Sequence, residues 1–212
     1  MDGSARRERL ARSRLYLVLE ARPHAADPRP LLEAALRGGV DVVQLRDKNL
    51  GDDALLAAAE PFRAACEAHD ALFVLNDRPD LVAVCGADGV HVGRNDTPVD
   101  AARSIIGPER LLGLSVSTLD ELGDVAGADY VGVTAFATPT KDDAVPGGLE
   151  LLGAAAESLT VPWFAIGGID LSTVAAAAVA GAPGVAVVRA IRDAHEPEDA
   201  ARQLRAALDR EQ

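Results

Sequence analysis

Three segments of the chain place polar and charged side chains shortly after apolar runs. The first follows residues 40–43, the second follows residues 71–75, and the third lies beyond residues 130–133. If these runs are parallel strands of one sheet, their carboxyl ends meet on one rim and bring the three groups together. Cations, amides and carboxylates gathered there would suit a metal-bound polyphosphate. The segments are Gln44-Leu45-Arg46-Asp47-Lys48, Asn76-Asp77 and Thr138-Pro139-Thr140-Lys141.

Gln44, Arg46 and Lys48 alternate along the first segment, so an extended strand would point them the same way. A guanidinium can bind two phosphate oxygens at once, and an ammonium group acts as a point charge. A glutamine amide can both donate to a heterocycle and accept from it. The alternative is a strand end held by salt bridges to Asp47 and the acidic loop after it. The alternating pattern favours a phosphate site beside a ring-binding amide.

Asp77 and Asp96 each follow an asparagine at the end of an apolar run, and the two runs are consecutive. Their carboxylates would therefore be neighbours on the rim. Mg²⁺ accepts such a small set of oxygen ligands when substrate phosphates and water fill its other positions. Alternatively, each aspartate caps a helix, because Pro79 and Pro98 follow at positions typical of a first helical turn. The two roles can coexist, and the pairing of carboxylates favours a Mg²⁺ site.

Two further polar residues lie within predicted strands. His91 invites a role as general base, but a histidine inside a strand is more often a buried, hydrogen-bonded packing residue, and we favour that interpretation. Ser115 lies outside any G-x-S-x-G motif, which argues against a nucleophile. We interpret its hydroxyl as a phosphate ligand.

Glycine-rich and cationic ends of the last two apolar runs predict a second phosphate site. Gly167-Gly168 follows the apolar run at residues 163–166, the seventh along the chain, and Val188-Arg189 ends the eighth run, at residues 184–188. In barrels of eight strands, phosphate commonly binds after strands seven and eight, where main-chain N–H groups face the anion. The sequence contains neither a Walker A motif nor a G-x-G-x-x-G fingerprint, so chemistry driven by nucleotide hydrolysis has no support.

Composition limits the partners of the protein. A net charge of −12 argues against nucleic acid and anionic membrane surfaces. The two cysteines, Cys66 and Cys85, have no metal-ligand spacing and suggest buried packing residues in a reducing cytoplasm. Residues 1–14 predict a charged N-terminal arm or first helical turn, and no apolar run reaches the length of a membrane span. We expect small phosphorylated molecules as partners, and the sequence leaves the oligomeric state open, a homo-oligomer included.

Short apolar runs alternate with Ala-rich amphipathic segments along the chain. Eight such pairs without an intervening linker predict a single (β/α)8 barrel spanning residues 1–212, rather than an open sheet. Several helices are predicted to end in glycine, followed within a few residues by aspartate at the start of the next strand. The predicted strands are 15–19, 40–45, 71–75, 89–92, 111–116, 130–133, 163–166 and 184–188, and the helices are 30–37, 53–69, 79–85, 99–105, 119–126, 149–158, 171–180 and 197–208.

The combined motifs resemble the thiamine-phosphate synthase family from residue 15 to residue 208. They are QLRDK, LNDRPDL, GADGVHVGRND, GLSVST, ADYVG followed by TPTK, AIGGI and GVAVV, in the order and spacing of that family. The resemblance implies a (β/α)8 barrel that joins a pyrimidine methyl diphosphate to a thiazole phosphate with Mg²⁺ bound, releasing pyrophosphate. It implies pyrimidine diphosphate binding by residues 44–48, Asn76, Ser115 and Lys141, Mg²⁺ binding by Asp77 and Asp96, and thiazole phosphate binding by Thr138, Pro139, Thr140, Gly167, Gly168, Val188 and Arg189.

The sequence departs from the family pattern chiefly on the thiazole side. Arg189 and Ser117 replace a usual serine and histidine, the first strand ends in Leu19-Glu20 rather than Thr-Asp, and residues 134–137 lack the usual Gly-Pro. Two alternatives therefore stay open. One is a thiazole tautomerase-like barrel, which would need acid–base groups rather than a metal and diphosphate set. The other is a non-catalytic barrel that binds a thiamine precursor.

Overall fold

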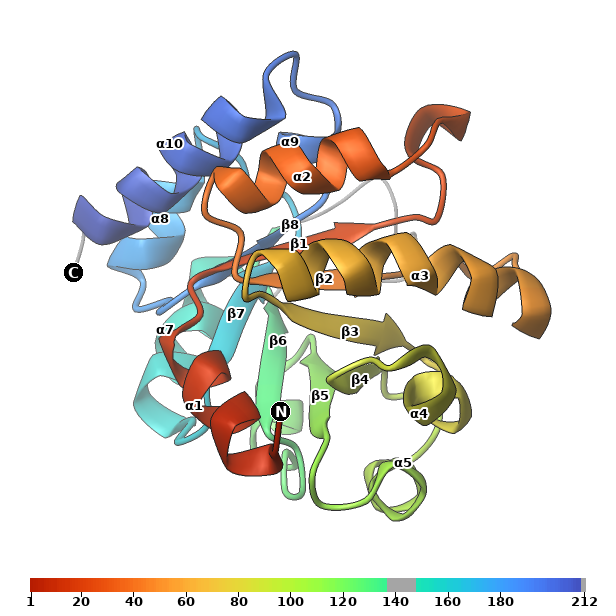
Figure 1. Ribbon diagram of the computed structural model, residues 1–212. Coiled ribbons are helices and arrows are strands. Elements are labelled where there is room, and N and C mark those ends of the chain that lie inside the picture. Colours follow the sequence, from red (N-terminus) through yellow and green to blue (C-terminus); the bar gives the residue numbers. More distant parts are fainter. Residues whose placement is uncertain (137–147, 211–212) are drawn as a thin grey trace.

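The computed structural model describes residues 1–136 and 148–210, and within them eight parallel strands close into a barrel (Figure 1). Each strand pairs with the next in sequence, and β8 pairs with β1. This confirms the (β/α)8 barrel predicted from the alternating apolar and amphipathic segments. The strands are β1 (Leu15–Leu19), β2 (Val42–Leu45), β3 (Leu72–Asn76), β4 (Gly89–Val92), β5 (Leu111–Val116), β6 (Tyr130–Thr134), β7 (Trp163–Ile166) and β8 (Val185–Val187).

Helices surround the barrel and cover the outer face of the strands (Figure 1). They are α1 (Gly3–Arg12), η1 (Pro23–Ala25), α2 (Arg29–Arg37), α3 (Asp52–Ala68), η2 (Pro79–Leu81), α4 (Val82–Cys85), α5 (Val99–Ile106), α6 (Leu119–Leu122), α7 (Gly148–Ser158), α8 (Val174–Val179), α9 (Arg189–Arg192) and α10 (Pro197–Arg210). Departures from the predicted ranges include the full helix α1, the early end of α6 at Leu122, and the additional short helices η1 and α9.

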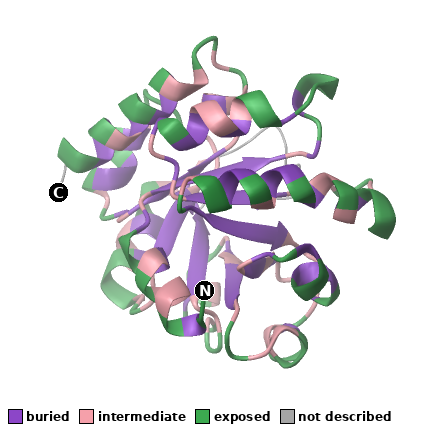
Figure 2. Cartoon of the chain, in the orientation of Figure 1, coloured by how far each residue is buried: buried purple, intermediate pink, exposed green. Residues whose placement is uncertain are grey.

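The strands are buried on both faces, while the helices bury one side and expose the other (Figure 2). In β2, Val43 and Leu45 pack outward into the large core between sheet and helices. Val42 packs inward, with Leu72, Val74 and others, into a smaller cluster that fills the barrel. Such two-sided burial explains why the strands read as continuous apolar runs.

Aspartates at the starts of three strands fasten the amino end of the barrel. Each follows a turn that returns from a helix, and each accepts a main-chain N–H from the start of the preceding strand in the barrel. Glycine supports these turns: Gly39, for example, has φ +100, which costs a residue without a Cβ little. The bonds are Leu15 N–H to Asp41 (3.0 Å), Phe73 N–H to Asp88 (3.0 Å) and Leu112 N–H to Asp129 (2.8 Å).

The predicted N-terminal arm is a helix, α1, docked on these same aspartates. Arg6 pairs with Asp88 at 2.9 Å and Arg7 with Asp129 at 2.8 Å. Leu10, only 1% exposed, joins the cluster inside the barrel. The residues predicted to form a charged arm or first helical turn therefore close the amino end of the barrel, because their arginines pair with partly buried carboxylates and Leu10 packs in the core.

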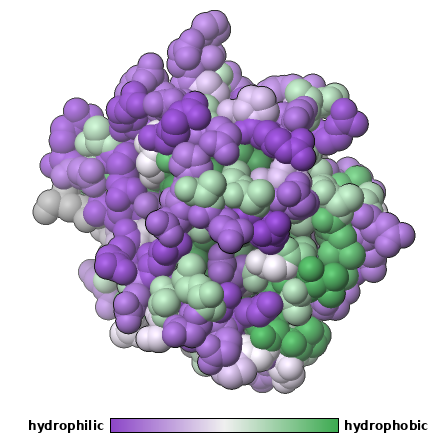
Figure 3. All heavy atoms as spheres, in the orientation of Figure 1, coloured by the Kyte–Doolittle hydropathy of each residue, from purple (hydrophilic) through white to green (hydrophobic). Residues whose placement is uncertain are grey.

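Both cysteines are free and buried, as predicted. Within residues 1–136 and 148–210, every helix is too short or too polar to cross a membrane. Figure 3 shows a largely hydrophilic face with an apolar area over α4 and α5, where Val84 and Ile105 are exposed.

Candidate active site at the carboxyl end of the barrel

The side chains that end β2 divide between the inside and outside of the barrel. Gln44 is buried, and its Nε2 donates to the Tyr16 hydroxyl at 2.8 Å. Arg46 is half-buried, and its guanidinium forms no hydrogen bond or ion pair with any described residue. Lys48 reaches across to β3 and pairs with Asp77 at 3.0 Å. Gln44 thus points into the barrel, as the alternation predicts, and Lys48 reaches the neighbouring strand end.

Leu45 and Asp47 lie on the other side of the same segment. The Leu45 side chain is fully buried in the outer core. Asp47 accepts the N–H of Asn49 at 3.2 Å and lines a cavity of about 590 Å³ between the β1–α2 loop and α3. The alternative of a strand end salt-bridged through Asp47 is wrong for the described residues, because Lys48 pairs with Asp77 instead.

Asp77 and Asp96 form a carboxylate pair at the ends of β3 and β4. Burial raises the pKa of Asp77, the adjacent Asp96 carboxyl raises it further, and the hydrogen bond from Lys48 lowers it. Asp77 has φ +60, a left-handed conformation that few residues other than glycine adopt. This conformation sets the direction of the Asp77 carboxyl group. Asp96 accepts the N–H of Gly93 at 2.9 Å. Neither aspartate caps a helix: Arg78 and Pro98 occupy the cap positions, without a side-chain bond, so that alternative is wrong.

The chemistry of this pair fits a divalent cation with an open coordination sphere. Within residues 1–136 and 148–210, no three histidine, cysteine, aspartate or glutamate side chains gather as a closed metal site would require. Two carboxylates at one point, one of them already neutralised by an ammonium group, provide hard oxygen ligands with room for phosphate and water. Asp77 and Asp96 are the described residues that would hold Mg²⁺.

His91 and Ser115 lie inside the mouth and bond to each other. The distance from His91 Nε2 to Ser115 Oγ is 2.9 Å, and His91 Nδ1 lies 3.3 Å from the Tyr130 hydroxyl. His91 is therefore a half-buried, hydrogen-bonded residue, as the sequence suggested. Ser115, predicted to bind phosphate, has a protein partner as well.

The ends of β7 and β8 supply glycine main chain and a cation. Gly167 and Gly168 have φ +96 and +62. Val188 is half-buried, and Arg189 is exposed without an ion pair to any described residue. Asp193, which could have held Arg189, pairs instead with Arg192 at 2.6 Å and with His24 at 3.1 Å. The structure therefore leaves the Arg189 guanidinium available to a ligand.

The remaining predicted residues are not all described. Thr138, Pro139, Thr140 and Lys141 lie outside the described residues. Asn76 ends β3, half-buried, and its side chain makes no hydrogen bond to a described residue. Sequence reasoning overlooked Tyr16 and Tyr130, which link Gln44 to His91 inside the barrel. The available signal was that the only two tyrosines of the chain occur within predicted strands.

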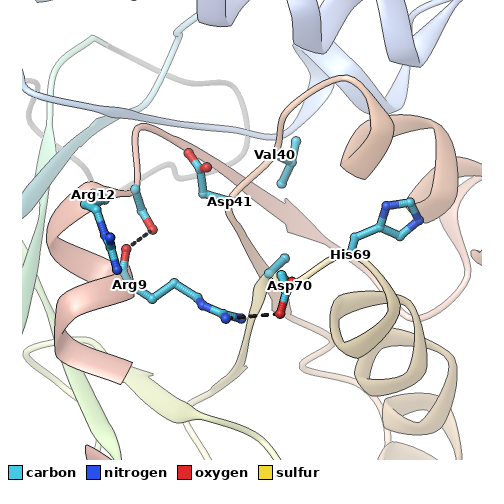
Figure 4. Close-up of a pocket in the computed structure, with 8 residues that line it drawn as sticks. Arg9, Arg12, Val40, Asp41, His69 and Asp70 are labelled. Carbon is cyan, nitrogen blue, oxygen red and sulfur yellow. Dashed lines mark hydrogen bonds and ion pairs between the residues drawn. The ribbon is translucent and has the colours of Figure 1, made fainter. Parts of the chain in front are cut away.

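A pocket lined by charged residues lies at the amino end of the barrel, opposite the candidate site. It lies between α1 and the starts of β2 and β3 (Figure 4). Arg9 points at Asp70 across it, with 3.1 Å between the charged atoms. Asp41 is bound by Arg205 at 2.7 Å, and His69 by Glu33 at 2.7 Å. These charges satisfy one another and lie far from the cations of the mouth.

Known proteins that are similar to this chain are thiamine-phosphate synthases. Residues 15–191 match the family model described as thiamine monophosphate synthase. The chain is 45% identical over 204 residues to the thiamine-phosphate synthase of Synechococcus sp. (strain CC9311), covering 94% of this chain and 58% of that protein. It is 43% identical to the thiamine-phosphate synthase of Mycobacterium bovis (strain BCG / Pasteur 1173P2), covering 94% and 96%.

A solved structure extends the agreement to three dimensions. The thiamine phosphate pyrophosphorylase of Pyrococcus furiosus superposes with a TM-score of 0.86 at 32% identity, covering 97% of this chain and 98% of that one. The chain spans 58% of the length of the Synechococcus relative, although it matches the mycobacterial and Pyrococcus proteins over nearly their full length. Sequence and fold agree, and the chain belongs to the thiamine monophosphate synthase family.

Proposed function

We propose that this protein is a thiamine-phosphate synthase. It would join 4-amino-2-methyl-5-(diphosphooxymethyl)pyrimidine to 4-methyl-5-(2-phosphooxyethyl)thiazole, or to the carboxylated form of that thiazole. The carbon–oxygen bond to the diphosphate breaks, and the thiazole nitrogen forms the new bond to the same carbon. The products are thiamine phosphate and pyrophosphate, with carbon dioxide also released when the carboxylated thiazole is used.

The observation that carries the proposal is an unpaired arginine beside a cluster of one lysine and two aspartates at one rim. The Arg46 guanidinium has no described ion-pair partner, and the Lys48–Asp77–Asp96 cluster lies at the ends of the neighbouring strands. Such a set explains how a chain with net charge −12 could bind a diphosphate.

The chemistry asks the protein for charge stabilisation rather than a nucleophile. An electron-rich aminopyrimidine can expel diphosphate to leave a stabilised cation, which the thiazole nitrogen captures. Arg46 and Lys48, with Lys141 by family resemblance, would stabilise the charge that grows on the leaving group. Mg²⁺, held by Asp77 and Asp96, would neutralise part of the same charge when bound. Preorganised contacts of this kind are each worth about 3–4 kcal/mol in a dry site.

The thiazole phosphate would bind on the other side of the mouth. Gly167 and Gly168 expose main chain there, and Arg189 offers a guanidinium that matches phosphate geometry. Thr138, Pro139 and Thr140 join this site by family resemblance. We also propose that the protein acts in the cytoplasm on small phosphorylated molecules, without nucleic acid or membrane partners.

A coupling assay with both substrates tests the proposal. Purified protein with Mg²⁺ should form thiamine phosphate and pyrophosphate in equal amounts, and excess chelator should abolish both. Isomerisation of a thiazole carboxylate in the absence of the pyrimidine would instead indicate a tautomerase-like barrel. Saturable binding of either substrate with no product would indicate a non-catalytic binding protein.

A further inference from the structure

Five side chains from five strands form one continuous hydrogen-bonded chain inside the barrel. We call Gln44, Tyr16, Tyr130, His91 and Ser115 the tyrosine relay. The successive distances are 2.8 Å from Gln44 Nε2 to the Tyr16 hydroxyl, 3.0 Å between the two tyrosine hydroxyls, 3.3 Å from the Tyr130 hydroxyl to His91 Nδ1, and 2.9 Å from His91 Nε2 to Ser115 Oγ. The residues at its two ends, Gln44 and Ser115, are ones that the family resemblance places at the pyrimidine diphosphate.

The surrounding barrel is shaped to hold this chain. The Phe164 ring meets both tyrosine rings edge-on, at centroid distances of 5.3 Å and 6.1 Å. A Cβ at Gly113 would lie 2.2 Å from Cζ of Tyr130 and 2.5 Å from Nδ1 of His91, so the absence of a side chain there is what lets the two rings meet. Close packing around a set of polar atoms fixes their geometry.

The relay must have a direction, because each hydroxyl and each neutral imidazole carries only one proton to donate. If Gln44 donates to Tyr16, then Tyr16 donates to Tyr130 and Tyr130 donates to His91 Nδ1. His91 then carries its proton on Nε2 and donates to Ser115. Burial raises the pKa of both tyrosines above its ordinary value, so neither hydroxyl loses its proton near neutral pH.

The direction of the relay decides whether each of its two ends presents a hydrogen-bond donor or an acceptor to a ligand. In the direction just described, Gln44 offers its Oε1 as an acceptor and the Ser115 proton is available to donate. Reversal would turn the amide round, so that Gln44 offered N–H groups and Ser115 donated inward to His91. The two ends cannot change independently while the tyrosines connect them.

We propose that Tyr16 and Tyr130 are positioning residues that hold Gln44 with its carbonyl oxygen toward the mouth, and thereby select a heterocycle bearing an amino group. This inference rests on the proposed function for its substrate. A 4-aminopyrimidine presents an N–H donor to that oxygen, whereas its 4-oxo counterpart presents an acceptor and a protonated ring nitrogen. A site built around a hydrogen bond rejects the analogue that cannot form it far more strongly than it rejects a change of size.

Two phenylalanine variants separate the relay from simple packing. Tyr16→Phe removes the partner that orients Gln44. Tyr130→Phe removes the oxygen that accepts the Tyr16 hydroxyl proton. Tyr16 can then donate that proton to Gln44 Oε1, in competition with the substrate amino group. Ser13→Ala is the matched control, because the buried Ser13 hydroxyl donates to the Arg9 carbonyl at the amino end of the barrel, away from the relay.

The first measurement needs no substrate. Nitrogen-15 NMR of the histidines, with His91 assigned by the signals lost in His91→Gln, should show a neutral His91 protonated on Nε2. The Nδ1 signal should move in Tyr130→Phe, which removes its donor, and stay in place in Tyr16→Phe and Ser13→Ala. Protonation of His91 on Nδ1, or on both nitrogens, would overturn the proposed direction.

The second measurement compares kcat/KM for the aminopyrimidine diphosphate and its 4-oxo analogue. Both tyrosine variants should lose about tenfold or more of this selectivity while KM for the thiazole phosphate stays unchanged. Lower thermal stability with full selectivity would reduce the relay to packing. If the wild-type protein forms no product while His91 is protonated on Nε2, the proposed function fails and the relay stands. If the protein forms product while His91 is protonated on Nδ1, the relay fails and the proposed function stands.

Discussion

The Nζ of Lys48 lies 3.0 Å from Oδ2 of Asp77 and joins the ends of β2 and β3. The contact therefore joins Lys48, which is predicted to bind the diphosphate, to Asp77, which is predicted to bind the metal ion. An ammonium group and a divalent cation compete for the same carboxylate oxygens, so the pair links the two halves of the proposed site. The two residues belong to separate motifs in the sequence, yet the fold places them side by side.

Lys48→Met should tighten binding of a divalent cation and slow turnover. Removing the competing ammonium group should lower the Mn²⁺ dissociation constant by about two- to fivefold, the range of an exposed ion pair. Turnover should fall because charge growing on the leaving group loses a cation. Mn²⁺ titration by electron paramagnetic resonance and steady-state kinetics measure the two effects. Lys48→Arg is the control, and weaker Mn²⁺ binding in Lys48→Met would contradict the competition.

Asp77→Asn should abolish stabilisation by Mg²⁺ without harming the fold. Asparagine tolerates φ +60, the conformation of Asp77, and it carries no charge against Asp96. The melting temperature in chelator should equal or exceed that of the wild type, whereas Asp77→Ala should lose about 1 kcal/mol through strain. Melting curves with and without Mg²⁺ test this. An unchanged Mg²⁺ response in the asparagine variant would remove Asp77 from the metal site.

Arg189→Ser should raise KM for the thiazole phosphate and leave KM for the pyrimidine diphosphate unchanged. The Arg189 side chain is exposed and unpaired among the described residues, so its loss should change stability by less than about 0.5 kcal/mol. Arg192→Ser is the matched control, since Arg192 bonds Glu20 at 3.1 Å and Asp193 at 2.6 Å. That variant should lose stability instead. A constant or lower KM for the thiazole phosphate in Arg189→Ser would exclude the contact.

Leu10→Ala should destabilise the protein and leave its active site intact. Leu10 is 1% exposed inside the amino end of the barrel, so truncation leaves a cavity costing about 2–5 kcal/mol. Leu119→Ala, at a leucine that is 51% exposed, should cost far less. Urea unfolding measures both. Equal losses would show that α1 does not pack in solution as it does here.

Gly113→Ala should destabilise the barrel and displace the His91–Tyr130 pair. The new methyl group would overlap Cζ of Tyr130 at 2.2 Å, and overpacking of a core costs about 1–3 kcal/mol. Gly153→Ala provides the contrast, because a Cβ there, in α7, meets no atom within 4 Å. Alanine should stabilise that helix by about 0.5–1 kcal/mol. Thermal unfolding compares the two, and equal stability of the variants would contradict the packing argument.

The sequence by itself determined the barrel and the positions of most mouth residues. Strands buried on both faces must be apolar along their length, so runs such as Leu15–Leu19 and Leu111–Val116 could be read directly. Strand alternation then separated Gln44, which points into the barrel, from Leu45, which packs outward, because side-chain direction in an extended strand is a local property. The resemblance to a known family grouped the same residues by role.

Only the tertiary structure decided which polar groups meet. Lys48 pairs with Asp77 and not with Asp47, the charged N-terminal residues form a helix that closes the barrel, and neither Asp77 nor Asp96 caps a helix. Tyr16 and Tyr130 are 114 residues apart in sequence, yet their hydroxyls lie 3.0 Å apart because strands facing one another across a closed barrel share its interior. Local patterns fix the direction of each side chain, but its partner depends on the closure of the barrel and on the space that residues such as Gly113 leave open.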